Sequence, residues 1–393
     1  MYPYQASIKA YVAEHKQEML RFLIDLINLE GHYSEKTQVE KVRDFYQEAL
    51  EEEGFQCRVV EVAPDRAGIL IAELGADRPG KPIILEGHLD TVHRTGSFGG
   101  PNPCRVENGI VYGPGVVDMK GGMVIALYIV KALNAVGFCK CPIKVIAVCD
   151  EEADHVGNDG DKILTDACVG GCIGLSFEVA PENNCLATRR KAQLIYHIDI
   201  HGVGGHAGNN FWEAKNAIFE ANRIINEVTK LTNKEEETTV TASVIRAGEQ
   251  QTAIPDTCKL VFDIRIVSEA ERKRVIDAFE QVLRHPSEGY TIEYDLEVAK
   301  LKPLQETEAV LAAWNFVNEA AVACGYAPFG KILRGGANDA GNIAAAGVPT
   351  IDSCGMTGSF AHNIKEYAVL DSLYARVEIF ATALSEIQNF SVG

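Results

Sequence analysis

Short apolar runs alternate with helix-patterned segments along the first half of the chain, and this alternation limits the fold more than any other feature. The apolar runs lie at Pro82 to Leu85, Ile143 to Val148 and Cys172 to Phe177, and helical spacing of apolar residues covers Ser7 to Leu29 and Gly121 to Ala135. Strands that alternate with helices in this way form a parallel sheet with helices on its faces. We therefore predict an α/β fold with a mostly parallel central sheet flanked by helices.

A second type of pattern begins near Lys191. Apolar residues alternate with polar ones over Leu194 to Ile200 and again over Leu260 to Ile266, which is typical of half-buried strands. Helical patterns cover Glu213 to Leu231 and Glu269 to Arg284. Together these segments predict an antiparallel sheet with two helices on one face, inserted into the chain as an α+β domain.

A chain of 393 residues is long enough for two domains. After Pro303 the pattern returns to helices around one apolar run, at Thr307 to Cys324, Ala337 to Ala345, Asp371 to Ile387 and Val348 to Ile351. This last part of the chain is predicted to rejoin the first sheet. The expected domains are therefore residues 190–299 for the insertion, and residues 1–189 together with 300–393 for the larger domain.

Net charge, apolar runs and cysteine spacing limit the expected partners and the expected cellular location. A formal net charge of −18 repels nucleic acid and anionic membranes, and no apolar run is long enough to span a bilayer, so neither partner is expected. The 11 cysteines show no pairing framework, which indicates reduced thiols. Met1 to Lys16 lacks the pattern of a secretion signal, so we expect a cytoplasmic protein.

A histidine and an acid, His88 and Asp90, stand two residues apart shortly after the apolar run that ends at Leu85. Residues i and i+2 of an extended chain share a face. One imidazole nitrogen of His88 can therefore bind a metal while Asp90 accepts a hydrogen bond from the other nitrogen and fixes the tautomer. The His-x-Asp pair is a weak signal by itself.

A glycine-rich turn at residues 112–122 places one acid, Asp118, immediately before a helix. Glycines in such a turn permit close backbone approach and unusual torsion angles. A Gly-Pro turn with a helix-capping aspartate explains the same residues, so both interpretations stay open at this point. A phosphate-binding loop is excluded, because no GxxxxGK[ST] motif is present.

Three acids, Asp150, Glu151 and Glu152, follow almost directly on the apolar run that ends at Val148. Carboxylates this close repel one another unless cations neutralise them, or unless one holds a proton and serves as acid or base. A solvated run of charges is the usual alternative, but the apolar strand before the acids disfavours it. Glu178 repeats the arrangement, because it directly follows the run that ends at Phe177.

His362 follows the apolar run Val348 to Ile351, and alone it is typical of an ordinary polar residue. The five candidate groups support one another, because all of them follow β-type runs, and open α/β sheets form their binding crevice at the carboxyl ends of strands. These groups contain His88, Asp118, Glu152, Glu178 and His362. Two histidines with several carboxylates favour zinc, with cobalt and manganese as alternatives.

The number of candidate ligands suits two metal ions that share Asp118. His88 and Glu178 would complete the protein ligands of one ion, and Glu152 and His362 those of the other. Each ion then has three protein ligands and an open position for water.

Glu151 is left outside this ligand set, beside the position of the water. A general base belongs there. The hypothesis is amide hydrolysis, in which the metals polarise the carbonyl while Glu151 takes a proton from water and returns it to the leaving amine.

Together these motifs resemble the aminoacylase and carboxypeptidase family of di-zinc metallohydrolases, which includes bacterial glutamate carboxypeptidase, succinyl-diaminopimelate desuccinylase and acetylornithine deacetylase. The glutamate carboxypeptidase branch looks closest. The matching motifs span nearly the whole chain, at residues 87–92, 112–122, 150–152, 175–178, 201–208 and 361–367. The resemblance implies a zinc-exopeptidase-like fold and two Zn²⁺ per subunit, with Co²⁺ or Mn²⁺ as alternatives.

The resemblance implies site roles that agree with the ligand count. Glu151 would be the base, Asp90 would stand behind His88, and a non-proline cis peptide bond would follow Asp118. The implied metal ligands, with Asp118 bridging, are His88, Asp118, Glu152, Glu178 and His362.

The resemblance also makes the inserted domain a lid that mediates homodimer formation. His206, in the glycine-rich segment at residues 204–208, would reach the partner subunit's active site and stabilise the oxyanion of the tetrahedral intermediate. Without the resemblance, His206 is an ordinary loop histidine.

Three further residues are candidates for substrate binding. Arg265 matches a family position that often holds the free carboxylate of the substrate, although a surface arginine on a strand is the alternative. Arg334 is a second candidate, one residue out of register with related carboxypeptidases. Thr252 stands where relatives commonly have a substrate-binding asparagine, and Phe211 replaces the usual proline after His206.

The predicted activity is metal-dependent hydrolysis of an amide or peptide bond in a small, carboxylate-bearing substrate, as in glutamate carboxypeptidases. A deacylase of N-acyl amino acids is the first alternative, since it needs the same carboxylate anchor. A non-catalytic metal-binding dimer is the second alternative, and it predicts a broken ligand set or a missing base, neither of which the sequence has.

Overall fold

The computed structural model of the chain describes residues 2–392. This part of the chain divides into two compact units. Unit 1 contains the residues up to Arg189, Gln305–Leu333 and the residues from Asn338 onward, and unit 2 contains Arg190–Leu304 and Arg334–Ala337. Each unit has its own apolar core.

Unit 1 is built on a six-stranded sheet with the strand order β1-β2-β6-β3-β7-β16. The strands β6, β3, β7 and β16 run parallel, whereas β2 and β1 extend one edge by antiparallel pairing. The predicted α/β fold with a mostly parallel sheet is therefore confirmed. The strands are β1 (Gln56–Val60), β2 (Ile69–Leu74), β3 (Ile83–His88), β6 (Ile143–Val148), β7 (Ile173–Ser176) and β16 (Thr350–Ile351).

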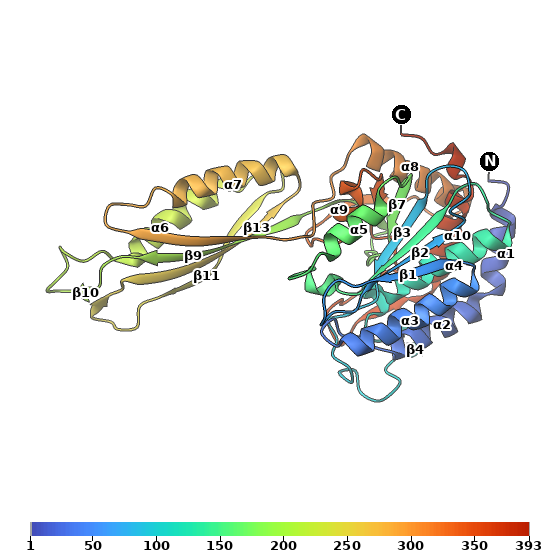
Figure 1. Ribbon diagram of the computed structural model, residues 1–393, viewed down its shortest axis with the longest axis horizontal. Helices are drawn as coiled ribbons and strands as arrows, with labels where there is room; N and C mark the ends of the chain where they lie inside the picture. The colour runs from blue at the N-terminus through green and yellow to red at the C-terminus, as the bar shows by residue number, and fades with distance from the viewer. Residues whose placement is uncertain (1, 393) are drawn as a thin grey trace. The chain divides into compact units, whose positions relative to one another are not determined.

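Helices cover both faces of this sheet (Figure 1), because successive residues of a strand point to opposite faces and both sets are apolar. Leu85 and Val145 belong to the core that contains α4, whereas Ile84 and Ile146 belong to the apolar cluster under α5 and α9. The helices of unit 1 are α1 (Gln5–Glu14), α2 (Lys16–Asn28), α3 (Lys36–Glu52), α4 (Gly121–Ala135), α5 (Gly160–Cys168), α8 (Glu308–Ala323), α9 (Ala340–Ala345), α10 (Leu370–Leu384) and η4 (Ile387–Asn389).

The single helix predicted over Ser7 to Leu29 is two helices, α1 and α2, which meet at His15. The backbone of His15 leaves helical geometry, with φ −99° and ψ 10°. Its Nδ1–H donates to the carbonyl oxygen of Tyr11 at 2.8 Å, and the two rings stack 3.9 Å apart. The apolar spacing continues across this break, so periodicity alone could not reveal it.

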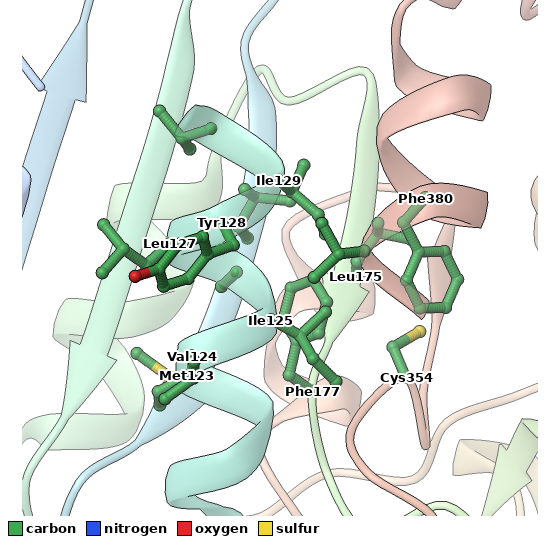
Figure 2. Packing of buried hydrophobic residues seen from close by; sticks show 14 of the residues in the cluster. Met123, Val124, Ile125, Leu127, Tyr128, Ile129, Leu175, Phe177, Cys354 and Phe380 are labelled. Carbon is green, nitrogen blue, oxygen red and sulfur yellow. The ribbon is translucent and has the colours of Figure 1, made fainter. Parts of the chain in front are cut away.

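Helix α4 forms the centre of the main core of unit 1 and is buried on nearly all sides. Figure 2 shows its residue Ile125 beside Phe177, with Phe380 of α10 closing the same cluster. Gly122 allows the start of α4 to lie against the chain that leaves β7, because a Cβ there would be 1.9 Å from the carbonyl oxygen of Phe177. This close approach brings the turn before α4 next to the loop after β7.

A second, smaller sheet in unit 1 brings two distant loops together. Its strand order is β17-β18-β5-β4, and all pairs are antiparallel. The loop between β17 and β18 contains His362, and the turn after β5 contains Asp118, so both loops leave adjacent strands. The strands are β4 (Arg105–Glu107), β5 (Ile110–Tyr112), β17 (Gly358–Ser359) and β18 (Tyr367–Val369); a separate pair joins β8 (Cys185–Arg190) and β15 (Gly330–Arg334).

Unit 2 has an antiparallel sheet in the order β11-β13-β9-β14, with α6 and α7 on one face (Figure 1). Alternate residues of β9 and β13 point into the core under the helices, where the ring of Tyr196 stacks on Phe279 of α7 with centroids 4.1 Å apart. This is the predicted α+β arrangement. The elements are β9 (Ala192–His201), β10 (Gly205–His206), α6 (Ala217–Val228), η3 (Thr229–Leu231), β11 (Thr239–Ala247), β12 (Ala253–Ile254), β13 (Thr257–Ile266), α7 (Glu269–Leu283) and β14 (Thr291–Val298).

Two general features of residues 2–392 bear on the expectations from composition. None of the helices in this range is both long and apolar enough to cross a membrane. All 11 cysteines of the chain are free thiols.

Candidate metal centre

Three loops leave the carboxyl ends of neighbouring parallel strands at one edge of the unit 1 sheet. His88 is the last residue of β3, Glu151 and Glu152 lie in the short helix η2 (Glu151–Ala153) after β6, and Glu178 lies just beyond β7. Because β3 lies between β6 and β7, these strands deliver one histidine and three carboxylates to the same place. Open α/β sheets form their binding crevices at such an edge.

Asp118 reaches this place from a tight turn, η1 (Val116–Lys120). The turn begins at Gly115, whose φ of 72° is left-handed, and a Cβ there would lie 2.5 Å from Cγ2 of Thr91. Asp118 departs from helical torsion angles, with φ −125° and ψ 89°, and its peptide bond to Met119 is cis. The cis bond that the resemblance implied is therefore present.

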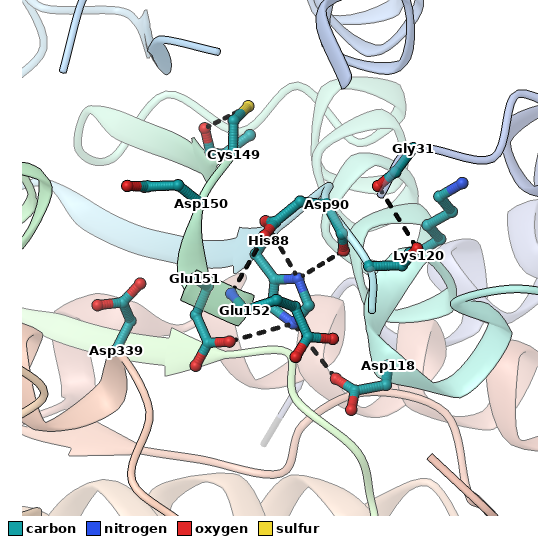
Figure 3. A network of polar contacts seen from close by, with 12 residues as sticks. Gly31, His88, Asp90, Asp118, Lys120, Cys149, Asp150, Glu151, Glu152 and Asp339 are labelled. Atoms are coloured by element: carbon teal, nitrogen blue, oxygen red, sulfur yellow. Dashed lines mark hydrogen bonds and ion pairs between the residues drawn. The ribbon is translucent and has the colours of Figure 1, made fainter. Parts of the chain in front are cut away.

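The side chain of Asp118 lies between two histidines, and each carboxylate oxygen faces a different one. Oδ1 is 3.2 Å from Nε2 of His88 (Figure 3), and Oδ2 is 3.2 Å from Nε2 of His362. His362 Nε2 is also 3.1 Å from Oε2 of Glu152, whereas His88 Nε2 is 3.8 Å from Oε1 of Glu178. These contacts divide the five residues into two groups that share Asp118.

Glu151 lies in the same cluster, on the side of His88 (Figure 3). Its Oε2 is 3.9 Å from Nε2 of His88, and its side chain is buried. The donor atoms of His88, Glu151 and Glu178 all lie within 4.8 Å of one another. By distance alone, Glu151 is therefore as well placed beside His88 as Glu178 is.

Burial and neighbouring charges shift the pKa values of these groups strongly. Burial lowers the pKa of His88, but its hydrogen bond with Asp118 and the other acids around it hold that pKa well above its usual value. Hydrogen bonds with Asp118 and Glu152 raise the pKa of His362 to about 10. Burial raises the pKa of Glu151 well above its usual value. The cluster therefore favours the protonated forms of His88, His362 and Glu151.

The donor atoms present fit divalent metal cations. Imidazole nitrogens and carboxylate oxygens are the ligands of zinc, cobalt and manganese sites. Carboxylate oxygens about 5 Å apart repel by about 3 kcal/mol at an effective dielectric constant of about 20. Within residues 2–392, Oε1 of Glu152 is buried without a hydrogen-bond partner. A cation at this point would relieve the repulsion and satisfy the unpaired oxygen.

Asp90 supports the site in a different way from the one predicted. Nδ1 of His88 is 2.9 Å from the backbone carbonyl oxygen of Asp90, but 3.5 Å from its carboxylate. Nδ1–H therefore donates to the main chain, which leaves Nε2 to face Asp118. The Asp90 carboxylate instead accepts the backbone N–H of Glu152 at 3.1 Å. Its side chain thus anchors the loop that carries Glu151 and Glu152.

Glu366 is a buried carboxylate that the sequence analysis missed, and it ties three loops of the site together. It accepts three backbone N–H groups of the turn around Asp118, at 2.8 to 3.1 Å, and Nε2–H of His93 at 2.8 Å. His93 follows His88 closely in the sequence, and Glu366 follows His362 closely. That proximity to two candidate ligands is the only sequence signal that could have found this pair.

One end of the unit 2 sheet carries His206 and Thr252. β10 pairs with β12, and the N–H of Ala207 donates to the carbonyl oxygen of Thr252 at 2.8 Å. The side chain of His206 is exposed, and its Nδ1 accepts the N–H groups of Gly208 and Asn209 at 3.1 and 3.3 Å. In the neutral ring the proton is therefore on Nε2, which becomes a hydrogen-bond donor.

The opposite end of this sheet carries Arg265, and Arg334, at the end of β15, lies beside the residue that precedes β9. Arg265 donates to the carboxylate of Asp263 through Nε and Nη2, at 2.8 and 3.0 Å. The backbone carbonyl oxygen of Arg334 accepts the backbone N–H of Lys191 at 3.1 Å. Strand β13 covers about 25 Å between Thr257, at the His206 end, and Arg265. One unit 2 therefore does not bring His206 and the two arginines together, and their role in substrate binding stays a prediction.

A mostly parallel α/β sheet gathers two histidines and several carboxylates at one point, which provides the donor atoms of a divalent-metal site. The model of Peptidase family M20/M25/M40 matches residues 84–386. The chain therefore belongs to this family, which confirms the resemblance that the motifs indicated and hydrolysis as the class of reaction.

Known relatives include both peptidases and deacylases. Carboxypeptidase G2 of Pseudomonas sp. (strain RS-16) is 25% identical over 383 residues, which cover 95% of this chain and 90% of that protein. Acetylornithine deacetylase of Myxococcus xanthus is 28% identical over 259 residues, which cover 61% of this chain and 65% of that protein.

Solved structures share the fold along almost the whole chain. Aminopeptidase PepT of Bacillus cereus ATCC 10987 has a TM-score of 0.81 at 19% identity, and the match covers 95% of this chain and 99% of that one. A Bacillus subtilis protein described as a dinuclear metal-binding peptidase of the M20 family has a TM-score of 0.69 at 16% identity, with 96% and 100% covered.

Proposed function

We propose that the chain is a di-zinc hydrolase that cleaves an amide or peptide bond in a small substrate with a free carboxylate, in the manner of a glutamate carboxypeptidase. The observation that carries this proposal is the position of Asp118, whose two oxygens contact His88 and His362 separately. A carboxylate placed in this way is suited to bridge two cations. The similarity to carboxypeptidase G2 over 95% of the chain supports the choice of a peptidase.

In this proposal Asp118 would contribute to the binding of both Zn²⁺, together with His88 and Glu178 for one ion and Glu152 and His362 for the other. Co²⁺ or Mn²⁺ are alternatives. When bound, the cations would polarise the scissile carbonyl and lower the pKa of the attacking water. The description of the Bacillus subtilis neighbour as dinuclear supports two ions instead of one.

Glu151 is the proposed general base, because it is buried beside His88 and lies outside the set of five ligands. Its carboxylate would take a proton from water as the water oxygen bonds to the carbonyl carbon. It would then pass this proton to the amide nitrogen as the C–N bond breaks. The Asp90 carboxylate would help to fix the base, through its hydrogen bond to the next residue, Glu152.

His206 is proposed to stabilise the oxyanion, with Nε2–H as the donor. Its Nδ1 already accepts two backbone N–H groups, which supports this tautomer. A small substrate held by Arg265 lies about 25 Å of strand away from the His206 of the same chain. That separation supports a homodimer through the inserted domain, in which His206 acts on the partner subunit's substrate.

Mixed dimers test this arrangement. Chains with His206→Ala and chains with Glu151→Gln should each be nearly inactive as homodimers. Co-expression with two different tags allows the mixed dimer to be purified, and one of its two sites then has both an intact base and an intact His206. We expect about half of the wild-type turnover per dimer.

The matched control is a doubly tagged dimer of two His206→Ala chains, which should stay inactive. A mixed dimer with no more activity than its parent variants would contradict action in trans. Failure to recover any doubly tagged dimer would contradict the dimer itself.

A deacylase of N-acyl amino acids is the second candidate, and the similarity to acetylornithine deacetylase favours it. Both candidates need an anchor for the free carboxylate, for which we propose Arg265 and Arg334. Thr252 lies at the His206 end of the sheet, so it is proposed as a further contact to the substrate of the partner subunit. Asp263 binds Arg265 through two nitrogens and thereby fixes the plane of its guanidinium group. A guanidinium held in this way is suited to bind a carboxylate.

Parallel assays of dipeptides ending in glutamate and of N-acetyl amino acids separate the two candidates. We expect the dipeptides to have the higher kcat/KM. The same substrates with a C-terminal amide should lose about 10- to 100-fold in kcat/KM, because they lack the charged partner of the arginines. Equal cleavage of acids and amides would contradict the carboxylate anchor, and a preference for N-acetyl amino acids would select the deacylase.

A further inference from the structure

His155 is a buried histidine that lies between two buried aspartates. Its Nδ1 is 2.9 Å from Oδ1 of Asp150, and its Nε2 is 3.0 Å from Oδ1 of Asp339. All three side chains are at most 2% exposed. In Figure 3, Asp150 and Asp339 lie on one side of Glu151, whereas Asp118 lies on the other. The aspartate pair is therefore behind the proposed base and not among the proposed ligands.

Both partners of His155 are carboxylates, so both ring nitrogens donate and the ring is positively charged. Burial lowers the pKa of His155, but Asp339 and Asp150 outweigh this effect and hold the pKa well above its usual value. Loss of the ring would leave two buried carboxylates without their shared cation, which is strongly unfavourable. The ring therefore joins the two acidic side chains into one rigid group.

The loop after Glu152 is folded around this ring. Asp154 and His155 have φ of 51° and 54°, left-handed values that are uncommon for residues other than glycine. At the start of α5, a Cβ on Gly160 would lie 2.5 Å from Nδ1 of His155. Asn158 closes the loop, because its Nδ2 donates to Asp150 at 2.6 Å and its Oδ1 accepts the N–H of Gly160 at 2.7 Å.

We propose that His155 is a positioning residue that holds the proposed base, Glu151, in its working position. Asp150 directly precedes Glu151, so the hydrogen bond from His155 to the Asp150 side chain fixes the backbone from which Glu151 projects. We call His155 with its two aspartates the clamp. Asp339 gives the clamp a support outside the loop, at the start of α9, where Asn342 donates to it at 3.0 Å. This inference rests on the proposed role of Glu151.

The segment that carries the base is thus held from two directions. His155 binds Asp150 before the base, and Asp90 accepts the N–H of Glu152 after it. A displacement of a catalytic group by about 1 Å can cost about 100-fold in rate. Loss of either anchor is therefore expected to reduce turnover, although His155 touches neither the substrate nor the proposed ligands.

The test uses the full-length, metal-loaded enzyme with His155→Gln, alone and combined with Glu151→Gln. We expect His155→Gln alone to lower kcat by about 10- to 100-fold with little change in KM. In the Glu151→Gln background the same change should lower the residual kcat by less than about threefold, because it acts through a base that is already absent.

The matched control is Tyr326→Phe, which removes a hydrogen bond to Glu378 of 3.0 Å elsewhere in unit 1. It should lower the melting temperature without changing kcat. If His155→Gln does not fold, Asp339→Asn takes its place, because asparagine keeps the shape and an acceptor for His155. We expect this milder variant to show a smaller loss of kcat that again disappears in the Glu151→Gln background.

Two results would overturn the positioning role. One is a kcat within about twofold of wild type for the folded variant, and the other is an equal fold-loss in both backgrounds, which indicates a general structural effect. Full turnover of Glu151→Gln by itself would refute the base, and with it the proposed mechanism. An inactive Glu151→Gln beside a fully active His155→Gln would refute only the clamp.

Discussion

Replacement of Glu151 by glutamine should lower kcat by about 100- to 10,000-fold while the metal content stays unchanged. Glutamine keeps the size of the side chain but cannot accept a proton from water. The five proposed ligands are intact in this variant, so both ions should remain bound. The measurement is kcat on the preferred substrate, together with elemental analysis of the same protein sample.

The control for this variant is Glu107→Gln, on an exposed position of strand β4, which should leave both quantities unchanged. Normal turnover of Glu151→Gln would show that the base lies elsewhere. Loss of metal together with turnover would make Glu151 a ligand. The distances are compatible with Glu151 as a ligand, because Oε2 of Glu151 and Oε1 of Glu178 lie 3.9 and 3.8 Å from Nε2 of His88.

Replacement of Asp118 by asparagine should remove both metal ions and lower kcat/KM by at least about 1,000-fold. Asp118 faces His88 and His362 with separate oxygens, whereas asparagine offers one oxygen and an NH₂ group that repels a cation. Each of the two proposed metal positions therefore loses part of its ligand set. Elemental analysis after dialysis, followed by activity with added Zn²⁺, measures the effect.

An exposed aspartate on strand β14, Asp295, provides the control as Asp295→Asn, which should keep full metal content and activity. Full metal content in Asp118→Asn would contradict the bridging role. Loss of a single ion would assign Asp118 to one position only.

The candidate ligands could be predicted because they stand where local patterns end. His88 ends an apolar strand, Glu152 and Glu178 follow two others, and neighbouring parallel strands end at the same edge of a sheet. Asp118 and His362 were harder to place, since their loops meet through the small sheet in which β18 pairs with β5. For these two residues, the choice of ligand depended on the resemblance and on counting ligands.

Contacts between residues far apart in the sequence could not be predicted. His155 and Asp339 are separated by 184 positions, and His93 and Glu366 by 273. No periodicity or motif records such a pair, because each residue alone is an ordinary polar residue in a loop. Both pairs are recognisable only in the folded structure, where all four side chains are buried.

Asp90 and α9 show a finer limit. Residues i and i+2 of a strand lie on the same face, which predicts that Asp90 lies near His88. This rule does not decide whether the carboxylate or the backbone carbonyl of Asp90 accepts the hydrogen bond from His88. Helix α9 was predicted from Ala337, yet it begins at Ala340, because the side chain of Asn338 accepts the N–H of Ala340 at 3.2 Å. Side-chain caps of this kind compete with the helix locally.

Metal content and hydrolysis, measured on one sample of the wild-type chain, decide whether it is a dinuclear metallohydrolase. Elemental analysis before and after chelation is paired with cleavage of dipeptides ending in glutamate and of N-acetyl amino acids. We predict two ions per chain, cleavage that chelation abolishes, and recovery on adding Zn²⁺. A chain that binds no metal, or cleavage that survives complete metal removal, would contradict the proposed function.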